Sequence, residues 1–114
     1  MAPKTMEPFW WSLFSAGGVV AAFLVPVHLF LHGIAIPLGW VPVSPARMAV
    51  LAAHPIVKLY LFVLIALPLY HWAHRFRFIL EDLGLHGYRM PLAVLCYGAA
   101  ILGTVATALV LVRL

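Results

Sequence analysis

Polar residues of this chain gather at the end of one apolar run, in the segment LPLYHWAHRFRF (residues 67–78). If the segment is helical, His71, His74, Arg75 and Phe78 share one face, because residues three and four apart are neighbours on a helix. Imidazole and guanidinium groups beside aromatic rings can donate hydrogen bonds to the carbonyls of a flat ligand and can stack on it. The same residue types are also typical of an ordinary membrane interface.

A second set of such residues lies near the amino terminus, where Trp11, Phe14, Ser15 and Gly18 share a helical face. If the first two apolar segments run antiparallel, Trp11 and Arg75 reach the same membrane boundary. The donors gathered there would fit a quinone head group, and a histidine close to water is suited to carry the protons that a quinol releases. We therefore predict a quinone site at this boundary, with interfacial anchoring as the alternative.

Three further histidines form another candidate site. His28 and His32 are one helical turn apart in the first apolar segment, and His54 precedes the second. With the amino terminus inside, all three lie near the outer boundary, where they could line a second quinone site, a proton exit or a haem pocket. Two histidines one turn apart cannot supply opposite axial ligands to one haem. Neutral imidazoles hydrogen-bonded to the backbone or to partner helices are the ordinary interpretation.

The elements that must position these residues are membrane-spanning helices. The 114 residues are 66% hydrophobic and only 9% charged, whereas soluble domains carry about 25% charged residues. The chain is therefore a single integral membrane domain over residues 1–114, and 7 basic residues are too few for a nucleic-acid interface. Its contacts are predicted to be with the lipid bilayer and partner proteins. Cys96, the one cysteine, is expected to be a small buried apolar residue.

Charge gaps and hydrophobic length predict an all-α membrane protein with three transmembrane helices, at about residues 15–37, 56–80 and 90–112. Pro26 and Pro68 should kink their helices, because a proline removes one intrahelical donor.

The basic residues favour a cytoplasmic amino terminus. They divide into Lys4, Arg75, Arg77 and Arg89 on one side and Arg47, Lys58 and Arg113 on the other. Arg77 is expected to pair with Glu81 and to lie in solvent.

Small residues recur at intervals of four and predict close helix contacts, for which contact with a partner is favoured over packing within the chain. These residues are Gly17 with Ala21, Gly18 with Ala22, Ala99 with Gly103 and Thr107, and Ala100 with Thr104 and Ala108.

Four segments together resemble the D subunit of quinol:fumarate reductase, a membrane anchor. They are EPFWWSLFSAGG (7–18), PVHLFLHGIAIPLGW (26–40), ALPLYHWAHRF (66–76) and YGAAILGTVAT (97–107). The resemblance implies a three-helix anchor in the bacterial cytoplasmic (inner) membrane, packed beside a second anchor, the C subunit. The two anchors would hold a flavoprotein subunit with FAD and an iron–sulfur subunit on the cytoplasmic face. Menaquinol would bind where the two anchors and the iron–sulfur subunit meet, and no haem is expected.

By this resemblance, Trp11 and Arg75 would donate to the quinol head group, Phe14 would form a wall and His74 would handle protons. The sequence departs from the family at several positions. Some relatives have further histidines just after the His-Arg pair, where this chain has Arg77, Phe78 and Glu81. His54 and Pro55 stand where relatives have small or amide groups, and His28 and His32 stand where apolar residues are expected.

Other functions remain as alternatives. A haem-binding anchor of succinate dehydrogenase would run the reverse reaction, and a structural or assembly-only subunit would bind no quinone. A small multidrug transporter would need an embedded carboxylate, but Glu7, Glu81 and Asp82 all fall at predicted span boundaries.

Overall fold

The computed structural model describes residues 7–114, and this part of the chain is helical without strands. The first apolar segment is one helical run made of α1 (Glu7–Val19), η1 (Val20–Leu24), α2 (Val25–Phe30) and η2 (Leu31–Ala35). It is followed by α3 (Pro45–Ala53), α4 (Pro55–Asp82), η3 (His86–Tyr88) and α5 (Arg89–Arg113). Three stretches of 28 residues, Pro8–Ala35, Pro55–Asp82 and His86–Arg113, are long and apolar enough to cross a membrane. The predicted all-α fold with three membrane-spanning helices is confirmed.

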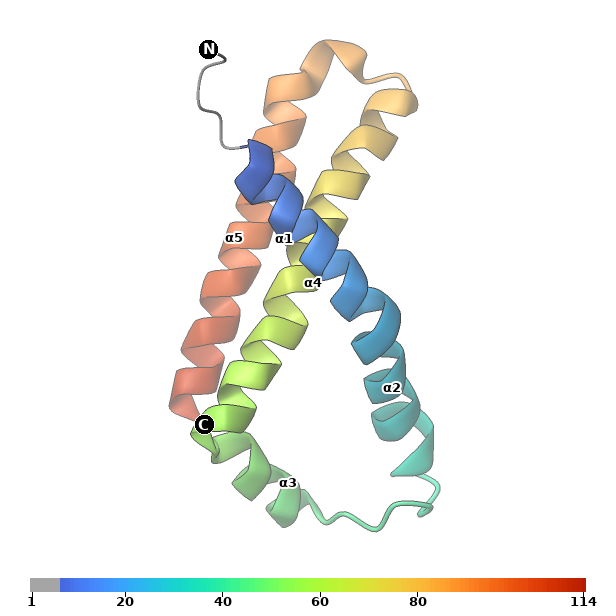
Figure 1. Ribbon diagram of the computed structural model, residues 1–114, viewed down its shortest axis with the longest axis vertical. Coiled ribbons are helices and arrows are strands. Elements are labelled where there is room, and N and C mark those ends of the chain that lie inside the picture. Colours follow the sequence, from blue (N-terminus) through green and yellow to red (C-terminus); the bar gives the residue numbers. More distant parts are fainter. Residues whose placement is uncertain (1–6) are drawn as a thin grey trace.

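Helices α4 and α5 run side by side, and α1 crosses them obliquely (Figure 1). Helix α2 continues away from this pair and leads through η2 and a loop to α3. The start of α1 lies toward the end of the molecule that carries η3, whereas α3 and the carboxyl terminus lie at the opposite end. We call these the η3 end and the α3 end. Lys4 lies outside the described residues.

The two prolines within the apolar helices have different surroundings. Pro26 is the second residue of α2, which follows the π-helix η1, and the missing proline N–H leaves the carbonyl of Ala22 in η1 without its usual partner. A widened turn is a common response to such a break in the hydrogen-bond ladder. Pro68, in contrast, lies inside α4, which continues as an α-helix from Pro55 to Asp82.

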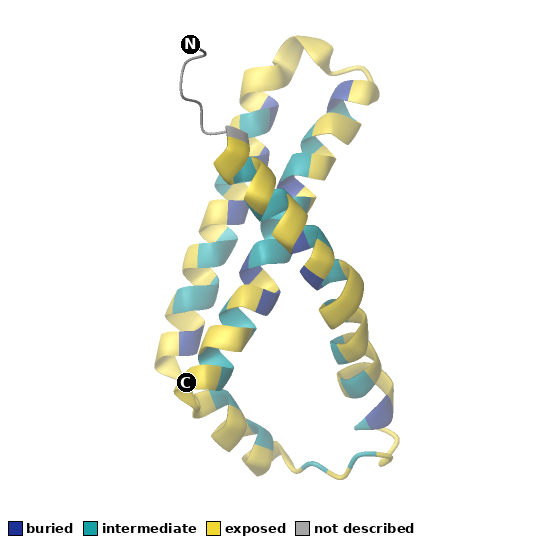
Figure 2. Ribbon diagram, in the orientation of Figure 1, coloured by how far each residue is buried: buried dark blue, intermediate teal, exposed yellow. Residues whose placement is uncertain are grey.

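The buried core is a narrow seam between α4 and α5. Ala73 and Ala100 are fully buried, and Cys96 is 4% exposed beside them. Leu69 and Tyr70 pack against this cluster. Dark blue positions are sparse on the ribbon and concentrate where helices face one another (Figure 2). The expectation that Cys96 is small, buried and apolar is confirmed.

Several small residues act within the chain. A Cβ added at Gly17 would overlap the backbone oxygen of Leu67, and one at Gly103 would come within 2.8 Å of a methyl group of Leu69. Ala100 is fully buried in the seam between α4 and α5. The prediction that such residues mainly contact a partner is therefore wrong at these positions. Ala22 and Ala99 are exposed and remain available to other chains.

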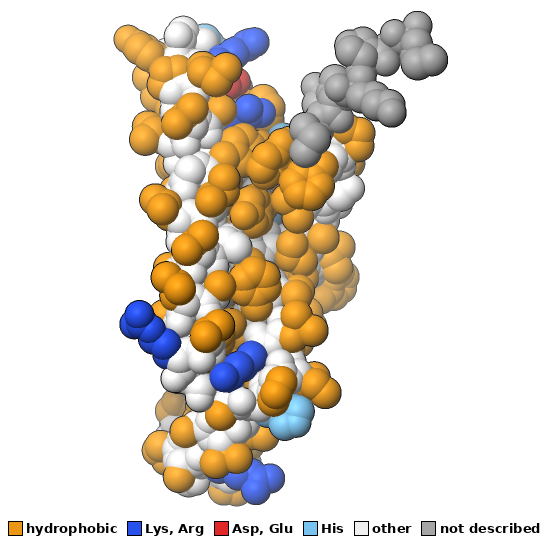
Figure 3. Space-filling view, turned by 90° about the vertical axis from the view of Figure 1, so that its left-hand side faces the viewer, with side chains coloured by type: hydrophobic (Ala, Val, Ile, Leu, Met, Phe, Trp, Pro, Cys, Tyr) orange, Lys and Arg blue, Asp and Glu red, His pale blue; other side chains and the backbone are white. Residues whose placement is uncertain are grey.

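Large hydrophobic side chains cover the outside of the molecule. Phe23 is 70% exposed and Leu102 is 72% exposed, although both lie in apolar helices. Figure 3 shows hydrophobic side chains over the middle of one face, with Lys and Arg side chains toward its two ends. This distribution suits contact with lipid tails and partner helices in the middle and with polar surroundings at both ends.

Candidate functional site

Two glycines allow α1 to approach α4 closely and so fix the site. Gly17 faces the carbonyl oxygen of Leu67, and a Cβ added at Gly18 would come within 3.0 Å of the His71 ring. Any side chain at Gly17 would force the two backbones apart. The close crossing places the preceding turn of α1, with Trp11 and Phe14, over the α4 turn that carries the histidines.

Phe14 is held between two histidines of α4. Its ring stacks on His71 with centroids 4.5 Å apart and an angle of 10° between the planes. The His74 ring lies 4.6 Å from it, and the Trp11 ring lies 5.2 Å away on the same helix. His71 Nδ1 donates a hydrogen bond of 3.1 Å to the Phe14 carbonyl oxygen. Phe14 is therefore a fixed aromatic wall.

The structure brings all four predicted quinone-site residues to one cavity of about 400 Å³, which we call the smaller cavity. Its lining consists of Trp11, Phe14, His74, Arg75, Phe78, Ile79 and Asp82. Trp11 is 58% exposed and Arg75 is exposed. Among residues 7–114 the one ion pair joins Arg89 and Glu81, so the Arg75 guanidinium is not paired within the described chain.

Tyr97 of α5 completes the surroundings of His74. The Tyr97 hydroxyl and His74 Nδ1 are 2.8 Å apart, which leaves Nε2 as the ring nitrogen available to a ligand. Tyr97 was not predicted as a site residue from the sequence. A usable signal was present, because a tyrosine in the middle of an apolar helix needs a hydrogen-bond partner for its hydroxyl.

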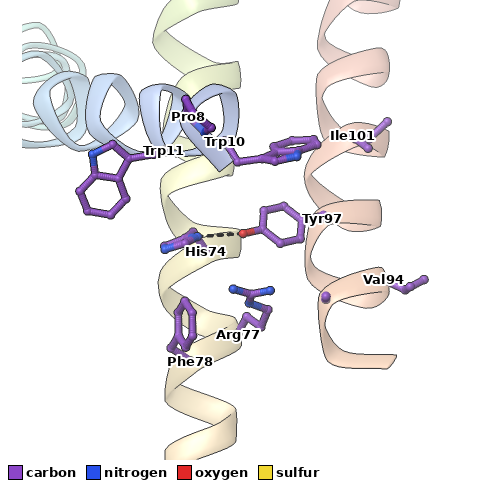
Figure 4. A pocket seen from close by; sticks show the side chains of 10 residues that line it. Pro8, Trp10, Trp11, His74, Arg77, Phe78, Val94, Tyr97 and Ile101 are labelled. Atoms are coloured by element: carbon purple, nitrogen blue, oxygen red, sulfur yellow. Dashed lines mark hydrogen bonds between the residues drawn. The ribbon is translucent and has the colours of Figure 1, made fainter. Parts of the chain in front are cut away.

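A second, larger cavity of about 980 Å³ lies on the α5 side of His74. Its walls are Pro8, Trp10, Trp11, His74, Arg77, Phe78, Ala93, Val94, Tyr97 and Ile101. Figure 4 shows Trp10 reaching toward α5, whereas Trp11 projects on the opposite side of α1, and the His74–Tyr97 hydrogen bond spans the gap between α4 and α5. The larger cavity shares Trp11, His74 and Phe78 with the smaller one.

The surroundings of Arg77 differ from those predicted from the sequence. Its guanidinium carbon lies 4.4 Å from the centroid of the Phe78 ring and 5.4 Å from that of Tyr97. Within residues 7–114, the buried Arg77 Nε has no hydrogen-bond partner. Glu81 instead faces Arg89, with 4.0 Å between Arg89 Nε and the carboxylate. The expected pairing of Arg77 with Glu81 in solvent is wrong, because the arginine turns between α4 and α5 over two aromatic rings.

The histidines predicted near the outer boundary do not form one cluster. The rings of His28 and His32 are 5.5 Å apart and nearly parallel, and His28 Nε2 lies 2.7 Å from the Tyr60 hydroxyl. His54 caps the start of α4, where its Nδ1 accepts a 3.2 Å hydrogen bond from the Ile56 amide. Among residues 7–114, no three His, Cys, Asp or Glu side chains are grouped to hold a metal ion.

Comparison with known proteins identifies the family. The family model of the fumarate reductase D subunit matches residues 2–112. The chain belongs to the fumarate reductase D-subunit family. Proteins of this name from Mycobacterium bovis (strain BCG / Pasteur 1173P2) and Mycobacterium tuberculosis (strain ATCC 25618 / H37Rv) are 46% identical over 103 residues, which cover 89% of this chain and 82% of the relatives. One from Shewanella sp. (strain W3-18-1) is 36% identical over 97% of this chain and 93% of its own length.

Membership in this family agrees with the three apolar helices. A member of this family with three helices able to span a membrane is a multi-pass membrane subunit, and the name of the family implies a complex with other subunits. The resemblance seen in the sequence is confirmed. The roles of the individual cavity residues remain predictions.

Proposed function

We propose that this chain is a membrane anchor of a menaquinol:fumarate reductase and supplies part of its quinol site. The observation that carries the proposal is that Trp11, Phe14, His74 and Arg75 line the smaller cavity near the η3 end. Two of the four side chains come from α1 and two from α4. The second anchor of the complex and the iron–sulfur subunit would provide the remaining walls, and the flavoprotein subunit would carry FAD.

The residues of the smaller cavity fit a quinone head group. Phe14 and Trp11 offer aromatic faces, and the Trp11 indole N–H and the Arg75 guanidinium offer donors for carbonyl or hydroxyl oxygens. The chemistry supplied by a bound quinol is the release of two electrons and two protons. His74 would exchange a proton at Nε2, because Tyr97 occupies Nδ1. Phe14, packed against His71, keeps this face of the cavity apolar.

The proposed orientation places the η3 end, with the smaller cavity, at the cytoplasmic face. Electrons from the quinol would then reach the iron–sulfur and flavoprotein subunits on that face directly. The basic residues of the sequence support this direction by four against three, with Lys4, Arg75, Arg77 and Arg89 on the proposed cytoplasmic side and Arg47, Lys58 and Arg113 on the other. The amino terminus would be cytoplasmic and the carboxyl terminus would lie outside, in the bacterial inner membrane.

Substitution of the two donors tests the proposal in the intact complex. Trp11→Phe removes a neutral donor, for which a net loss of about 0.5–1.5 kcal/mol predicts a roughly 2- to 12-fold fall in kcat/KM for menaquinol. Arg75→Gln removes a charged donor, for which about 1.5–3 kcal/mol predicts a fall of roughly 10- to 150-fold. The assay is menaquinol-dependent fumarate reduction by the purified complex.

Trp72→Phe is the matched control. Trp72 stacks on Phe76, with centroids 5.2 Å apart, and lines neither cavity. Its replacement should leave kcat/KM for menaquinol unchanged. Normal menaquinol turnover with both Trp11→Phe and Arg75→Gln in fully assembled complex would make the chain a structural or assembly-only subunit.

We further propose that the anchor binds no haem, which distinguishes it from a haem-bearing succinate dehydrogenase anchor. The parallel rings of His28 and His32 come from neighbouring turns of one helical run and cannot bind opposite faces of one iron. His54 is engaged at the start of α4. A haem would therefore need one of these histidines and a second axial ligand from another subunit. Our proposal of a haem-free anchor predicts that the visible absorption spectrum of the dithionite-reduced complex lacks a b-type haem band. Such a band, lost on replacing His28 or His32, would support the alternative.

A further inference from the structure

The larger cavity has a chemistry different from that of the smaller one. Among the described residues that line this cavity, Arg77 is the one with a permanent charge, and none is Asp or Glu. Nearby Glu81 faces Arg89. The buried Arg77 Nε lacks a hydrogen-bond partner within residues 7–114, although a buried donor of this kind is normally satisfied. Arg77 therefore brings to the wall of this cavity a positive charge that no carboxylate among the described lining residues compensates.

The position of Arg77 matches the depth of lipid head groups. Arg77 lies five residues before the end of α4 at Asp82, which corresponds to about 7.5 Å along a helix. Trp10, near the start of α1, reaches the same cavity. Tryptophan and arginine at helix ends are typical of the boundary between lipid tails and water.

The remaining lining offers a path for an apolar chain. Val94, Tyr97 and Ile101 recur along one side of α5 and cover about 10.5 Å of its length. Val94 is 63% exposed and Ile101 is 45% exposed, so this path opens onto the surface of the subunit. A ligand with an anionic head and a hydrocarbon tail would satisfy both parts of the cavity.

We propose that the larger cavity binds an anionic phospholipid, with the phosphate at Arg77 and an acyl chain along Val94 and Ile101. Arginine suits this role because its planar donors match phosphate oxygens. The lipid would lie directly behind the His74–Tyr97 hydrogen bond. This inference does not depend on which molecule occupies the smaller cavity.

Native mass spectrometry of the purified, delipidated complex titrated with phosphatidylglycerol tests the assignment. The unaltered complex should retain one more phosphatidylglycerol than the complex with Arg77→Gln, whose occupancy of that site should fall at least fivefold. Ala93→Phe, which fills the cavity but keeps the charge, should lower occupancy similarly. Arg77→Lys should retain more lipid than Arg77→Gln. Arg47→Gln, which removes an exposed arginine at the α3 end, should have no effect.

Equal phosphatidylglycerol counts in unaltered, Arg77→Gln and Ala93→Phe complexes would overturn the proposal. Loss of menaquinone instead of phospholipid from these variants would also overturn it, because the cavity would then belong to the quinone. If neither the Arg77→Gln complex nor the Ala93→Phe complex assembles, lipid competition on the unaltered complex tests the proposal. Retention of phosphatidylglycerol against a tenfold excess of phosphatidylcholine supports the proposal, and loss of this preference contradicts it.

Discussion

At the scale of single residues, His74 connects the two cavities and is held in place by Tyr97. The 2.8 Å hydrogen bond between them joins α4 to α5. The imidazole also lies near Phe14 and Phe78, with centroids 4.6 Å and 5.0 Å away. The ring can therefore rotate little without losing its hydrogen bond or its aromatic contacts. A proton-exchanging residue gains from such fixation, because its free nitrogen keeps one direction.

Tyr97→Phe should slow menaquinol oxidation without preventing assembly. Removing the hydroxyl costs one neutral hydrogen bond, about 0.5–1.5 kcal/mol, and frees the His74 ring. We expect kcat to fall by roughly 2- to 12-fold, while artificial electron donors that bypass the anchors support unchanged fumarate reduction. Steady-state kinetics with both donors measure the difference.

Tyr70→Phe is the control for this change. The Tyr70 hydroxyl accepts a hydrogen bond from Thr104, and Tyr70 lines neither cavity. An equal loss of menaquinol turnover in both variants would show that Tyr97 acts only through packing.

Helical spacing and an assumed antiparallel arrangement predicted that Trp11 and Arg75 meet at one boundary, and the resemblance to the family then selected Trp11, Phe14, His74 and Arg75 as the site residues. The position of Arg77 in the larger cavity was not predicted, because an ion pair with Glu81, four residues later on the same helix, was the simpler expectation. The actual surroundings of Arg77 include Tyr97 on another helix. Spacing within one helix gives no information on such contacts.

At the scale of helices, the crossing of α1 over α4 depends on Gly17. Its Cα faces the backbone of Leu67, next to Pro68, and a backbone atom cannot move aside as a flexible side chain can. Gly103, by contrast, faces the end of the Leu69 side chain, and a Cβ at Gly98 would have no neighbour within 4 Å in the described chain. Replacing these three glycines by alanine should therefore destabilise the protein to different degrees.

A graded series of alanine variants measures this difference. Gly17→Ala should destabilise the protein by about 1–3 kcal/mol or more, because overpacking separates the helices. Gly103→Ala should cost less, since Leu69 can change rotamer. Gly98→Ala should be neutral or stabilising by up to about 1 kcal/mol through helix propensity. Thermal unfolding of the detergent-solubilised complex gives the order, and a Gly98→Ala variant as unstable as Gly17→Ala would contradict the crossing.

The small residues illustrate what spacing can predict about helices. Intervals of four correctly indicated close approach, but did not reveal which surface approaches. Gly17 and Gly103 pack inside the chain, whereas Ala22 and Ala99 remain exposed. Three long apolar helices were predictable because the length of a span is fixed by the bilayer. The sequence predicted a kink at Pro26, but it did not predict the π-helical turn η1 that precedes this proline.

At the scale of the whole molecule, the protein has a small core and a large apolar surface. Few side chains other than those of small residues are buried, and many large hydrophobic residues are exposed (Figure 2). Such a chain requires lipid and partner helices around it. Both cavities lie toward the η3 end, so redox chemistry and lipid contact would share one face of the membrane. The central claim is that a quinone binds at that face between α1 and α4.

Photoaffinity labelling of the intact complex with an azido-menaquinone tests this claim most directly. After illumination, peptide mapping should find the label within residues 7–18 or 67–78, which carry Trp11, Phe14, His74 and Arg75. Excess unlabelled menaquinone should suppress the labelling. A label confined to the α2–η2 region around His28 and His32, with residues 7–18 and 67–78 unmodified, would contradict the account.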